Sequence, residues 1–138
     1  MTTQVKSEYR APSHVSEEPI QDLVVLPAPL LGTWHNINPS TNDLVKIVIA
    51  SAGTGITVNP YGACVPTPCN WGAVHGVAYA PNVSSSKAEA FSATFAFGFA
   101  NVIVVGHLRG SELLVETFTV FTDGSGRSNL YTSDTMKK

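Results

Sequence analysis

Charged residues are scarce in this chain, and long apolar runs are absent. Asp, Glu, Lys and Arg make up 13% of its 138 residues, against a usual share of about 25%. The formal net charge is −2, so no excess of positive charge predicts binding to nucleic acid or to an anionic membrane surface. No apolar run reaches the length of about 18 residues that a transmembrane helix needs. We therefore expect neither nucleic acid nor membrane as a partner.

Short apolar runs separated by turn-forming residues follow one another from Gly32 to the end of the chain. The runs are rich in Val, Ile, Thr, Phe and Tyr, and none has the 3.6-residue period of a helix. They predict eight strands, at residues 32–37, 44–50, 56–62, 73–80, 88–100, 101–110, 112–122 and 129–136. Short connections favour antiparallel neighbours, and an eight-stranded meander closes into a barrel without edges. We predict an all-β, eight-stranded antiparallel up-and-down β-barrel, with a two-sheet sandwich as the alternative.

The N-terminal segment differs from the strand region. Residues 1–19 are polar, carry mixed charge and show no periodicity, which predicts a disordered, flexible tail. Pro27 and Pro29 forbid a helix interior or a central strand, so residues 20–31 are expected to form an extended arm on the barrel or across its mouth. We assign residues 1–28 to the tail and arm and 29–138 to the barrel domain. The chain starts without the basic and apolar regions of a signal peptide, so the cytoplasm is the expected compartment.

The scarcity of charge is greatest in the middle of the chain. Between residues 44 and 108 the only charged residues are Lys46, Lys87 and Glu89. The strands at 88–100 and 101–110 are apolar or small on both faces, although a half-exposed strand normally alternates apolar and polar side chains. A covered outer surface explains both observations. We expect a homo-oligomer, either a dimer or a tetramer.

The first predicted strand carries a short motif. It reads Gly32-Thr33-Trp34, followed by Asn36 and Ser40, and it resembles the first strand of avidin- and lipocalin-like β-barrels, the streptavidin-like ones in particular. The resemblance covers the first two or three strands. It implies that Trp34 closes one end of a barrel and that Asn36 and Ser40 donate to the polar head of a ligand inside. That family surrounds biotin with several lumen tryptophans, whereas this chain has only two tryptophans, so biotin is not the expected ligand.

The densest group of reactive side chains lies between two predicted strands, from Tyr61 to His75, and includes Cys64 and Cys69. Two cysteines are too few for a disulfide scaffold. They form either one disulfide or, as a cytoplasmic location favours, two structural thiols. The C-x4-C spacing is not a usual zinc spacing, so neither a metal nor a cofactor is expected. A nucleophilic cysteine would need His75 as its base.

Polar residues within the predicted strands are candidates for a site inside the barrel. Glu116 lies among apolar neighbours, and a buried carboxylate is costly unless it is paired with Arg109, a histidine or a ligand. The alternative is that Glu116 points outward. Candidate catalytic residues are Glu116, His75 and Tyr79. Candidate ligand-binding residues are Asn36, Ser40, Tyr61, His75, Tyr79, His107, Arg109 and Glu116. A ladder of phenylalanines predicts core or subunit interface, or alternatively the wall of an apolar pocket, and consists of Phe91, Phe95, Phe97 and Phe99.

Three functions fit these observations. The first is the binding of a small apolar or amphipathic molecule in a mostly apolar lumen. The second is a lumen-templated cyclase or isomerase of small-molecule biosynthesis, which needs only one or two polar residues and leaves no sequence motif. The third is a self-associating structural or adaptor barrel. The sequence favours the first function and leaves open whether the protein is an enzyme.

Overall fold

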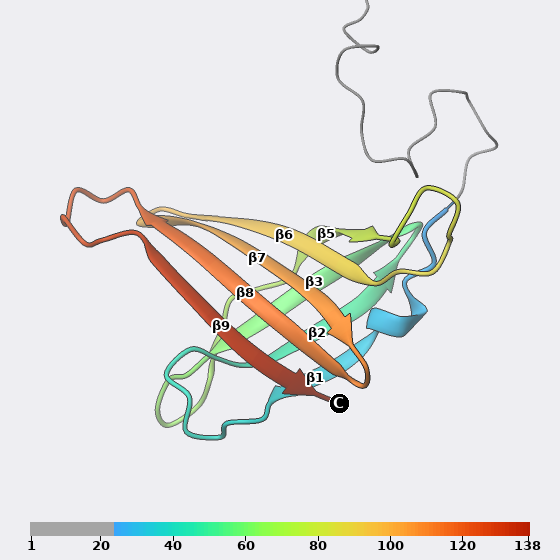
Figure 1. Ribbon diagram of the computed structural model, residues 1–138. Coiled ribbons are helices and arrows are strands. Elements are labelled where there is room, and N and C mark those ends of the chain that lie inside the picture. Colours follow the sequence, from blue (N-terminus) through green and yellow to red (C-terminus); the bar gives the residue numbers. More distant parts are fainter. Residues whose placement is uncertain (1–23) are drawn as a thin grey trace, which may run out of the picture.

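The computed structural model describes residues 24–138, which form a closed antiparallel β-barrel (Figure 1). The strands are β1 (Gly32–Asn36), β2 (Leu44–Ala52), β3 (Gly55–Gly62), β4 (Cys69–Asn70), β5 (Val74–Tyr79), β6 (Ala90–Phe97), β7 (Ala100–Arg109), β8 (Glu112–Phe121) and β9 (Leu130–Lys137). In this part of the chain the wall has eight strands in the order β1-β2-β3-β5-β6-β7-β8-β9, and pairing of β9 with β1 closes it. The short β4 pairs with the end of β3. The predicted eight-stranded barrel is confirmed.

Tight turns keep most strands beside their neighbours in sequence. The β2–β3 and β7–β8 hairpins leave two residues in each loop. The first loop residue is a glycine with positive φ in both, Gly53 at 61° and Gly110 at 64°, which is typical of the type II′ turn that matches the twist of a hairpin. These two hairpins lie at the end of the barrel where the chain enters. The β1–β2, β3–β5 and β8–β9 connections gather at the opposite end, to the left in Figure 1, and we call this end the mouth.

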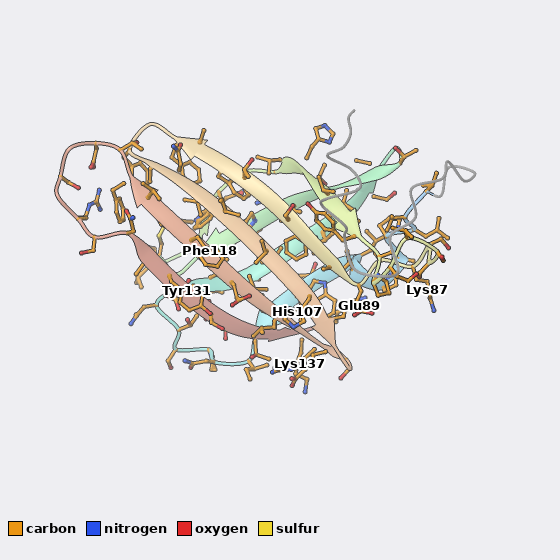
Figure 2. All side chains as sticks on the ribbon, turned by 45° about the horizontal axis from the view of Figure 1, so that its top comes forward. Lys87, Glu89, His107, Phe118, Tyr131 and Lys137 are labelled. Atoms are coloured by element: carbon orange, nitrogen blue, oxygen red, sulfur yellow. A yellow bond between two sulfur atoms is a disulfide. The ribbon has the colours of Figure 1, made fainter. Side chains whose placement is uncertain are left out.

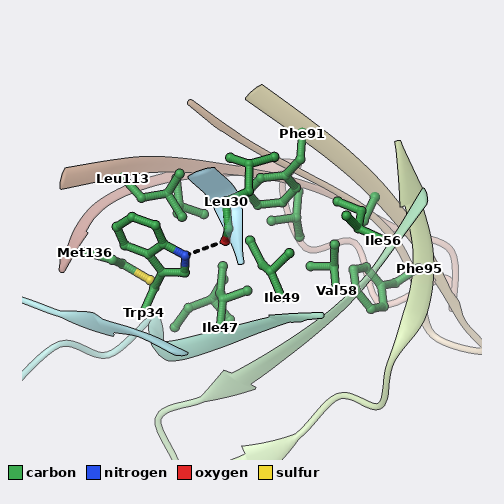
Figure 3. Close-up of a cluster of buried hydrophobic side chains, with 14 of the residues drawn as sticks. Leu30, Trp34, Ile47, Ile49, Ile56, Val58, Phe91, Phe95, Leu113 and Met136 are labelled. Atoms are coloured by element: carbon green, nitrogen blue, oxygen red, sulfur yellow. Dashed lines mark hydrogen bonds between the residues drawn. The ribbon is translucent and has the colours of Figure 1, made fainter. Parts of the chain in front are cut away.

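The interior of the barrel is filled with apolar side chains (Figure 3). Trp34 is buried near the end that faces away from the mouth, and its Nε1 donates to the Leu30 carbonyl oxygen at 2.8 Å. Leu30 ends a short 3-10 helix, η1 (Ala28–Leu30), and is fully buried. Burial of a side chain of this size is worth about 1.5–3 kcal/mol. The arm therefore closes this end of the barrel with its own core residue.

Shape matching in the core depends on one glycine in particular. Phe91 on β6 and Gly106 on β7 are direct cross-strand partners, and both are buried. A Cβ atom at Gly106 would overlap the Phe91 ring. The ring packs on the bare backbone of its partner strand, so this pair fits together only with glycine at position 106.

The two apolar faces of β6 and β7 have different surroundings. Phe91, Phe95 and Val104 point into the barrel and are buried, whereas Ile103 and Val105 alternate with the buried residues and face outward. The phenylalanine ladder is thus part of the core from Phe91 to Phe95. The outward face keeps an unusually apolar character.

The described part of the predicted tail and arm, residues 24–28, contacts the barrel. Leu26 forms a parallel bridge with Lys87, and Ala88 donates its backbone N–H to the Leu26 carbonyl oxygen at 3.0 Å. The arm then passes through η1 into β1. Residues 1–23 lie outside the described residues.

Within residues 24–138, no helix has both the length and the apolar character needed to cross a membrane.

Candidate functional site

A pocket of about 350 Å³ opens at the mouth of the barrel. Its walls come from the start of β2, the end of β3, the segment that carries both cysteines, and the mouth ends of β8 and β9. The residues that matter most for its chemistry are Asp43, Leu44, Trp71, Thr117, Thr119 and Thr132. Its volume lies within the range of about 300–1,000 Å³ that is typical of small-molecule sites.

The segment between β3 and β5 forms one wall of the pocket. Cys64 and Cys69 form a disulfide whose Cα atoms are 5.4 Å apart, and both residues line the pocket. Asn70 anchors the end of this segment, because its Oδ1 accepts hydrogen bonds from Asn59 Nδ2 at 2.7 Å and from the Gly72 backbone N–H at 2.8 Å. The disulfide and these hydrogen bonds fix the position of the next side chain, Trp71.

Trp71 divides the mouth pocket from the packed core. Its ring meets Phe95 and Phe97 edge to face, with centroids 5.5 Å apart in each case. Its Nε1 lies close to Gly62, where a Cβ atom would approach to 3.1 Å. The indole therefore offers a rigid apolar surface to the pocket, supported from behind by the phenylalanine ladder.

The polar side of the site is built around Asp134 on β9, which is 9% exposed. Asn36 on β1 donates from Nδ2 to Asp134 Oδ1 at 2.9 Å and to the Leu44 carbonyl oxygen at 2.8 Å. The Thr41 hydroxyl lies 3.4 Å from the same Asp134 oxygen. Asp134 follows Thr132, a pocket residue, as the next inward position along β9. The carboxyl group thus lies directly below the pocket.

The surroundings of Asp134 favour its protonated form. Burial raises its pKa above the usual value of 3.8, and the negative charge of the nearby Asp43 raises it further. The hydrogen bonds from Asn36 and Thr41 oppose this shift because they stabilise the carboxylate. The net effect is a raised pKa, in a carboxyl group beside a second carboxyl group that lines the pocket.

Two buried polar atoms of this region have no hydrogen-bond partner among the described residues. They are Asp134 Oδ2 and Thr117 Oγ1. Thr117 is 6% exposed and lines the pocket. The register pairs Thr117 with Thr132 and Val115 with Asp134, so Thr117 and Asp134 are diagonal neighbours on the inner face. An unpaired buried polar atom costs about 1–3 kcal/mol, and such atoms need an explanation.

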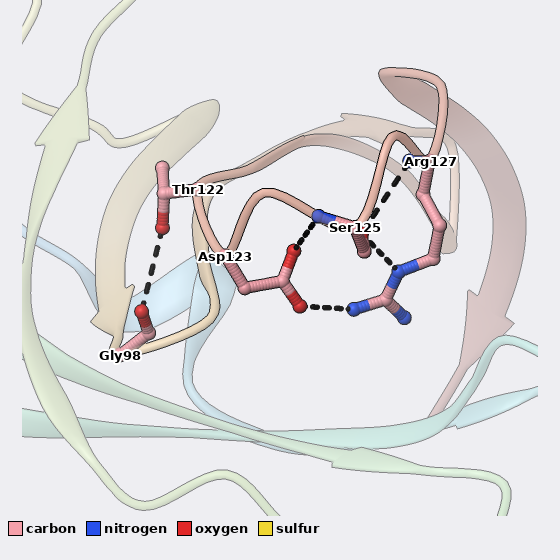
Figure 4. A network of polar contacts seen from close by, with 5 residues as sticks. All are labelled: Gly98, Thr122, Asp123, Ser125 and Arg127. Carbon is pink, nitrogen blue, oxygen red and sulfur yellow. Dashed lines mark hydrogen bonds and ion pairs between the residues drawn. The ribbon is translucent and has the colours of Figure 1, made fainter.

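The β8–β9 loop at the mouth has its own polar network (Figure 4). Arg127 Nη2 contacts Asp123 Oδ2 at 2.8 Å, and the Ser125 backbone N–H donates to Asp123 Oδ1 at 3.0 Å. Hydrogen bonds from the hydroxyl and backbone of Ser125 lower the pKa of Asp123 to about 2, and the Arg127 charge contributes. The Thr122 backbone N–H donates to the Phe99 carbonyl oxygen at 2.9 Å, which ties this loop to the β6–β7 turn.

The structure does not bring the candidate residues from the sequence together. Asn36 lies beside Asp134 below the pocket, and Ser40 is exposed in the β1–β2 connection. The other candidates lie on the outward faces of their strands, namely Tyr61, His75, Tyr79, His107, Arg109 and Glu116. They alternate with buried or half-buried residues, so they do not share a lumen pocket with Asn36.

Glu116 illustrates how the alternation of a strand places these residues on its outward face. Its neighbours in sequence, Val115 and Thr117, are the buried residues of β8, which turns Glu116 outward. There it accepts a hydrogen bond from the Tyr131 hydroxyl at 2.8 Å, and this bond raises the pKa of Tyr131. The outward position that the sequence left open as an alternative is the one observed.

Asp43, Thr117 and Asp134 are the functional candidates that sequence reasoning missed. Thr117 and Asp134 occupy the inward positions of strands that otherwise alternate with buried apolar residues, such as Val115 and Met136. A polar residue in the apolar register of a strand was the available signal. The sequence of a strand does not tell which of its two alternating sets of side chains faces the lumen. The polar residues can therefore be recognised as inward only once the closed barrel is known.

Two further hollows of about 370 and 410 Å³ lie toward the other end of the barrel. Neither is lined by a buried polar atom without a partner. Among residues 24–138, no group of three or more His, Cys, Asp or Glu side chains is placed to hold a metal ion. Comparisons with known proteins add nothing to the geometry, because no family model, curated protein or solved structure matches this chain.

Proposed function

We propose that this protein binds a small amphipathic molecule in the mouth pocket. The observation that carries the proposal is a pair of unpartnered buried atoms. Thr117 Oγ1 belongs to a residue of the pocket lining, and Asp134 Oδ2 belongs to the inward residue of β9 that follows the pocket residue Thr132. A polar group of a ligand would satisfy both atoms, and an apolar body would pack on Trp71 and Leu44. Small-molecule sites typically combine an apolar lining with a few convergent polar groups. The likeness of the first strand to avidin- and lipocalin-like barrels supports the same proposal.

The polar groups indicate the chemistry of the ligand. Asp134 Oδ2 accepts a hydrogen bond when the carboxyl group is ionised, and a donor on a bound ligand favours that form over the protonated one that burial favours. The ligand therefore presents N–H or O–H donors toward Asp134. A second carboxylate, Asp43, lines the same pocket, so a neutral or positively charged head group suits the site better than an anion. The ligand class is therefore a small molecule with a donor-rich head and an apolar body.

Native mass spectrometry of the full chain, purified from its own host, tests the proposal. We expect a bound small molecule that survives purification. Its rebinding can be followed by tryptophan fluorescence, because Trp71 lines the pocket whereas Trp34 is buried in the core. Trp71→Phe should remove most of the fluorescence response and leave the Trp34 signal.

Variants locate the bound molecule. Asp134→Asn and Thr117→Val are each expected to weaken binding at least about 10-fold, because a lost hydrogen bond in a buried site costs about 1.5 kcal/mol. Ser133→Ala is the matched control, since Ser133 is the outward-facing neighbour of Asp134 on β9. A protein that carries no ligand and rebinds none of the extracted molecules contradicts the proposal, as does unchanged affinity in both pocket variants.

A templated cyclase or isomerase is the second candidate, and the raised pKa of Asp134 favours it. A raised pKa brings a carboxyl group closer to the range in which it can act as a general acid. The two candidates differ in what becomes of the ligand. A bound molecule that leaves with its structure unchanged supports binding alone, whereas conversion that stops in Asp134→Asn supports the enzyme.

A further inference from the structure

The outward faces of β5 to β9 form a broad apolar surface, which we call the outer wall. Cross-strand pairing places Thr94, Ile103, Phe118 and Tyr131 side by side in one row across four strands. The neighbouring row runs through Val77, Ser92, Val105, Glu116 and Ser133. The outer wall lies outside the barrel and shares no residue with the lining of the mouth pocket.

Large apolar side chains of the outer wall are open to solvent. Ile103 is 46% exposed, Phe118 42% and Tyr131 53%. The Phe118 and Tyr131 rings contact each other with centroids 5.2 Å apart, so they form one continuous surface rather than isolated contacts. Figure 2 labels this pair on the neighbouring strands β8 and β9, with Tyr131 near the start of β9. Val77, Tyr79 and Val120 extend the surface and are also about half exposed.

Charged groups lie at the two ends of the outer wall and are nearly absent from its middle. Arg109, Glu112 and Lys137 form one row at the end away from the mouth. Asp123 and Arg127 lie beyond the other end, in the β8–β9 loop. On the outward faces of β5–β9 between these ends, Glu116 is the only Asp, Glu, Lys or Arg. Its carboxylate accepts the Tyr131 hydrogen bond, so it has a partner even when it is covered.

The outer wall is as large as the apolar patches that mark functional surfaces. A half-exposed aromatic or large aliphatic side chain offers on the order of 80–100 Å², so the six large side chains together offer roughly 500 Å². The small side chains between them bring the surface toward the ~800 Å² that each partner buries in a standard interface. The largest apolar patch on a typical monomer covers about 300–600 Å² and often has a function, and larger ones mark interaction sites.

We propose that the outer wall binds the outer wall of a second copy of this chain, in a two-fold symmetric dimer. Glu116 is the one charged residue of the centre, and it already accepts the Tyr131 hydrogen bond, so little charge opposes contact between two copies. Each end of the wall carries both signs of charge, so like charges do not dominate where the ends of two copies meet. An apolar centre with a charged rim is the usual anatomy of a protein interface. A two-fold axis makes the same patch serve both subunits and closes the assembly at two copies.

Analytical ultracentrifugation of the full 138-residue chain over a wide concentration range tests the dimer. We expect a species of twice the 14.6 kDa chain mass. Ile103→Lys places a charge in the centre of the wall, twice in each dimer, and should raise the dimer dissociation constant at least about 100-fold. Because Ile103 is already half exposed in the single chain, the variant should keep the thermal unfolding midpoint of the barrel at concentrations where the wild type is also monomeric.

Ile37→Lys is the matched control. Ile37 is 53% exposed but lies in the β1–β2 connection, away from the outer wall. This variant is expected to dimerise like the wild type. A wild-type chain that stays monomeric at all concentrations overturns the proposal, whether residues 1–23 or a different protein covers the wall. Equal association of Ile103→Lys and Ile37→Lys overturns it as well, and neither result bears on ligand binding at the mouth.

Discussion

Thr117→Val should make the ligand-free protein more stable. The Thr117 side chain is 6% exposed, and its hydroxyl has no hydrogen-bond partner among the described residues. Valine has nearly the same shape, so the substitution removes an unsatisfied polar atom without opening a cavity. Leaving such an atom unsatisfied costs about 1–3 kcal/mol, and we expect about 1 kcal/mol to be recovered. For a domain of this size, that gain raises Tm by on the order of 4 °C.

Urea unfolding of the ligand-free protein measures this effect. The midpoint should rise while the slope of the unfolding free energy against urea stays unchanged. Thr119→Val is the control, because Thr119 lines the same pocket but is only half buried, and its change should stay within about 0.5 kcal/mol. If Thr117→Val instead destabilises the protein by about 1 kcal/mol or more, the hydroxyl has a partner in the folded state, and the reasoning that assigns it to a ligand fails.

Asp134→Asn should stabilise the ligand-free protein at pH 7, because the folded state holds the pKa of Asp134 above 3.8. The folded wild type therefore gains stability as the pH falls toward 3.8, and the stability difference between the variant and the wild type should vanish there. Urea titrations at several pH values measure this difference. A difference that does not change with pH refutes the prediction. Gly106→Ala should destabilise the barrel by about 1–3 kcal/mol, since its Cβ overlaps the Phe91 ring. A neutral result in thermal unfolding would mean that the ring can move. Replacing Cys64 and Cys69 by serine should lower the free energy of unfolding by about 2 kcal/mol, because the disulfide no longer restricts a six-residue loop in the unfolded chain. Equal urea midpoints for the variant and the wild type would contradict this. Thiol labelling in host cells then distinguishes the cytoplasm from an oxidising compartment, which the disulfide favours.

The strand pattern made the barrel predictable. Runs of β-branched and aromatic residues were bounded by turns such as the one at Gly110, and these local signals act within a few residues of the chain. The order and pairing of the strands followed from their short connections. Pro27 and Pro29 excluded a helix interior and a central strand, but the short 3-10 helix at Ala28–Leu30 was not predicted.

The site was not predictable, because its parts are far apart in the sequence. The hydrogen bond between Asn36 and Asp134 joins residues 98 positions apart, and no local pattern marks that contact. Polar residues such as His75 and Glu116 were candidate site residues because they lie within predicted strands. Their strands turn them outward, while the less conspicuous Thr117 and Asp134 turn inward.

The sequence by itself determined an eight-stranded barrel, because periodicity and turn residues act locally. It also showed that the middle of the chain carries almost no charge. Only the tertiary structure decided which side of each strand faces the lumen. In β7, for example, Val104 and Ile103 are equally apolar, so nothing in their alternation distinguishes core from surface. When β9 pairs with β1 and closes the barrel, one side of every strand becomes the lumen side. This closure decides which residues form the apolar outer wall and which polar residues lie below the mouth pocket.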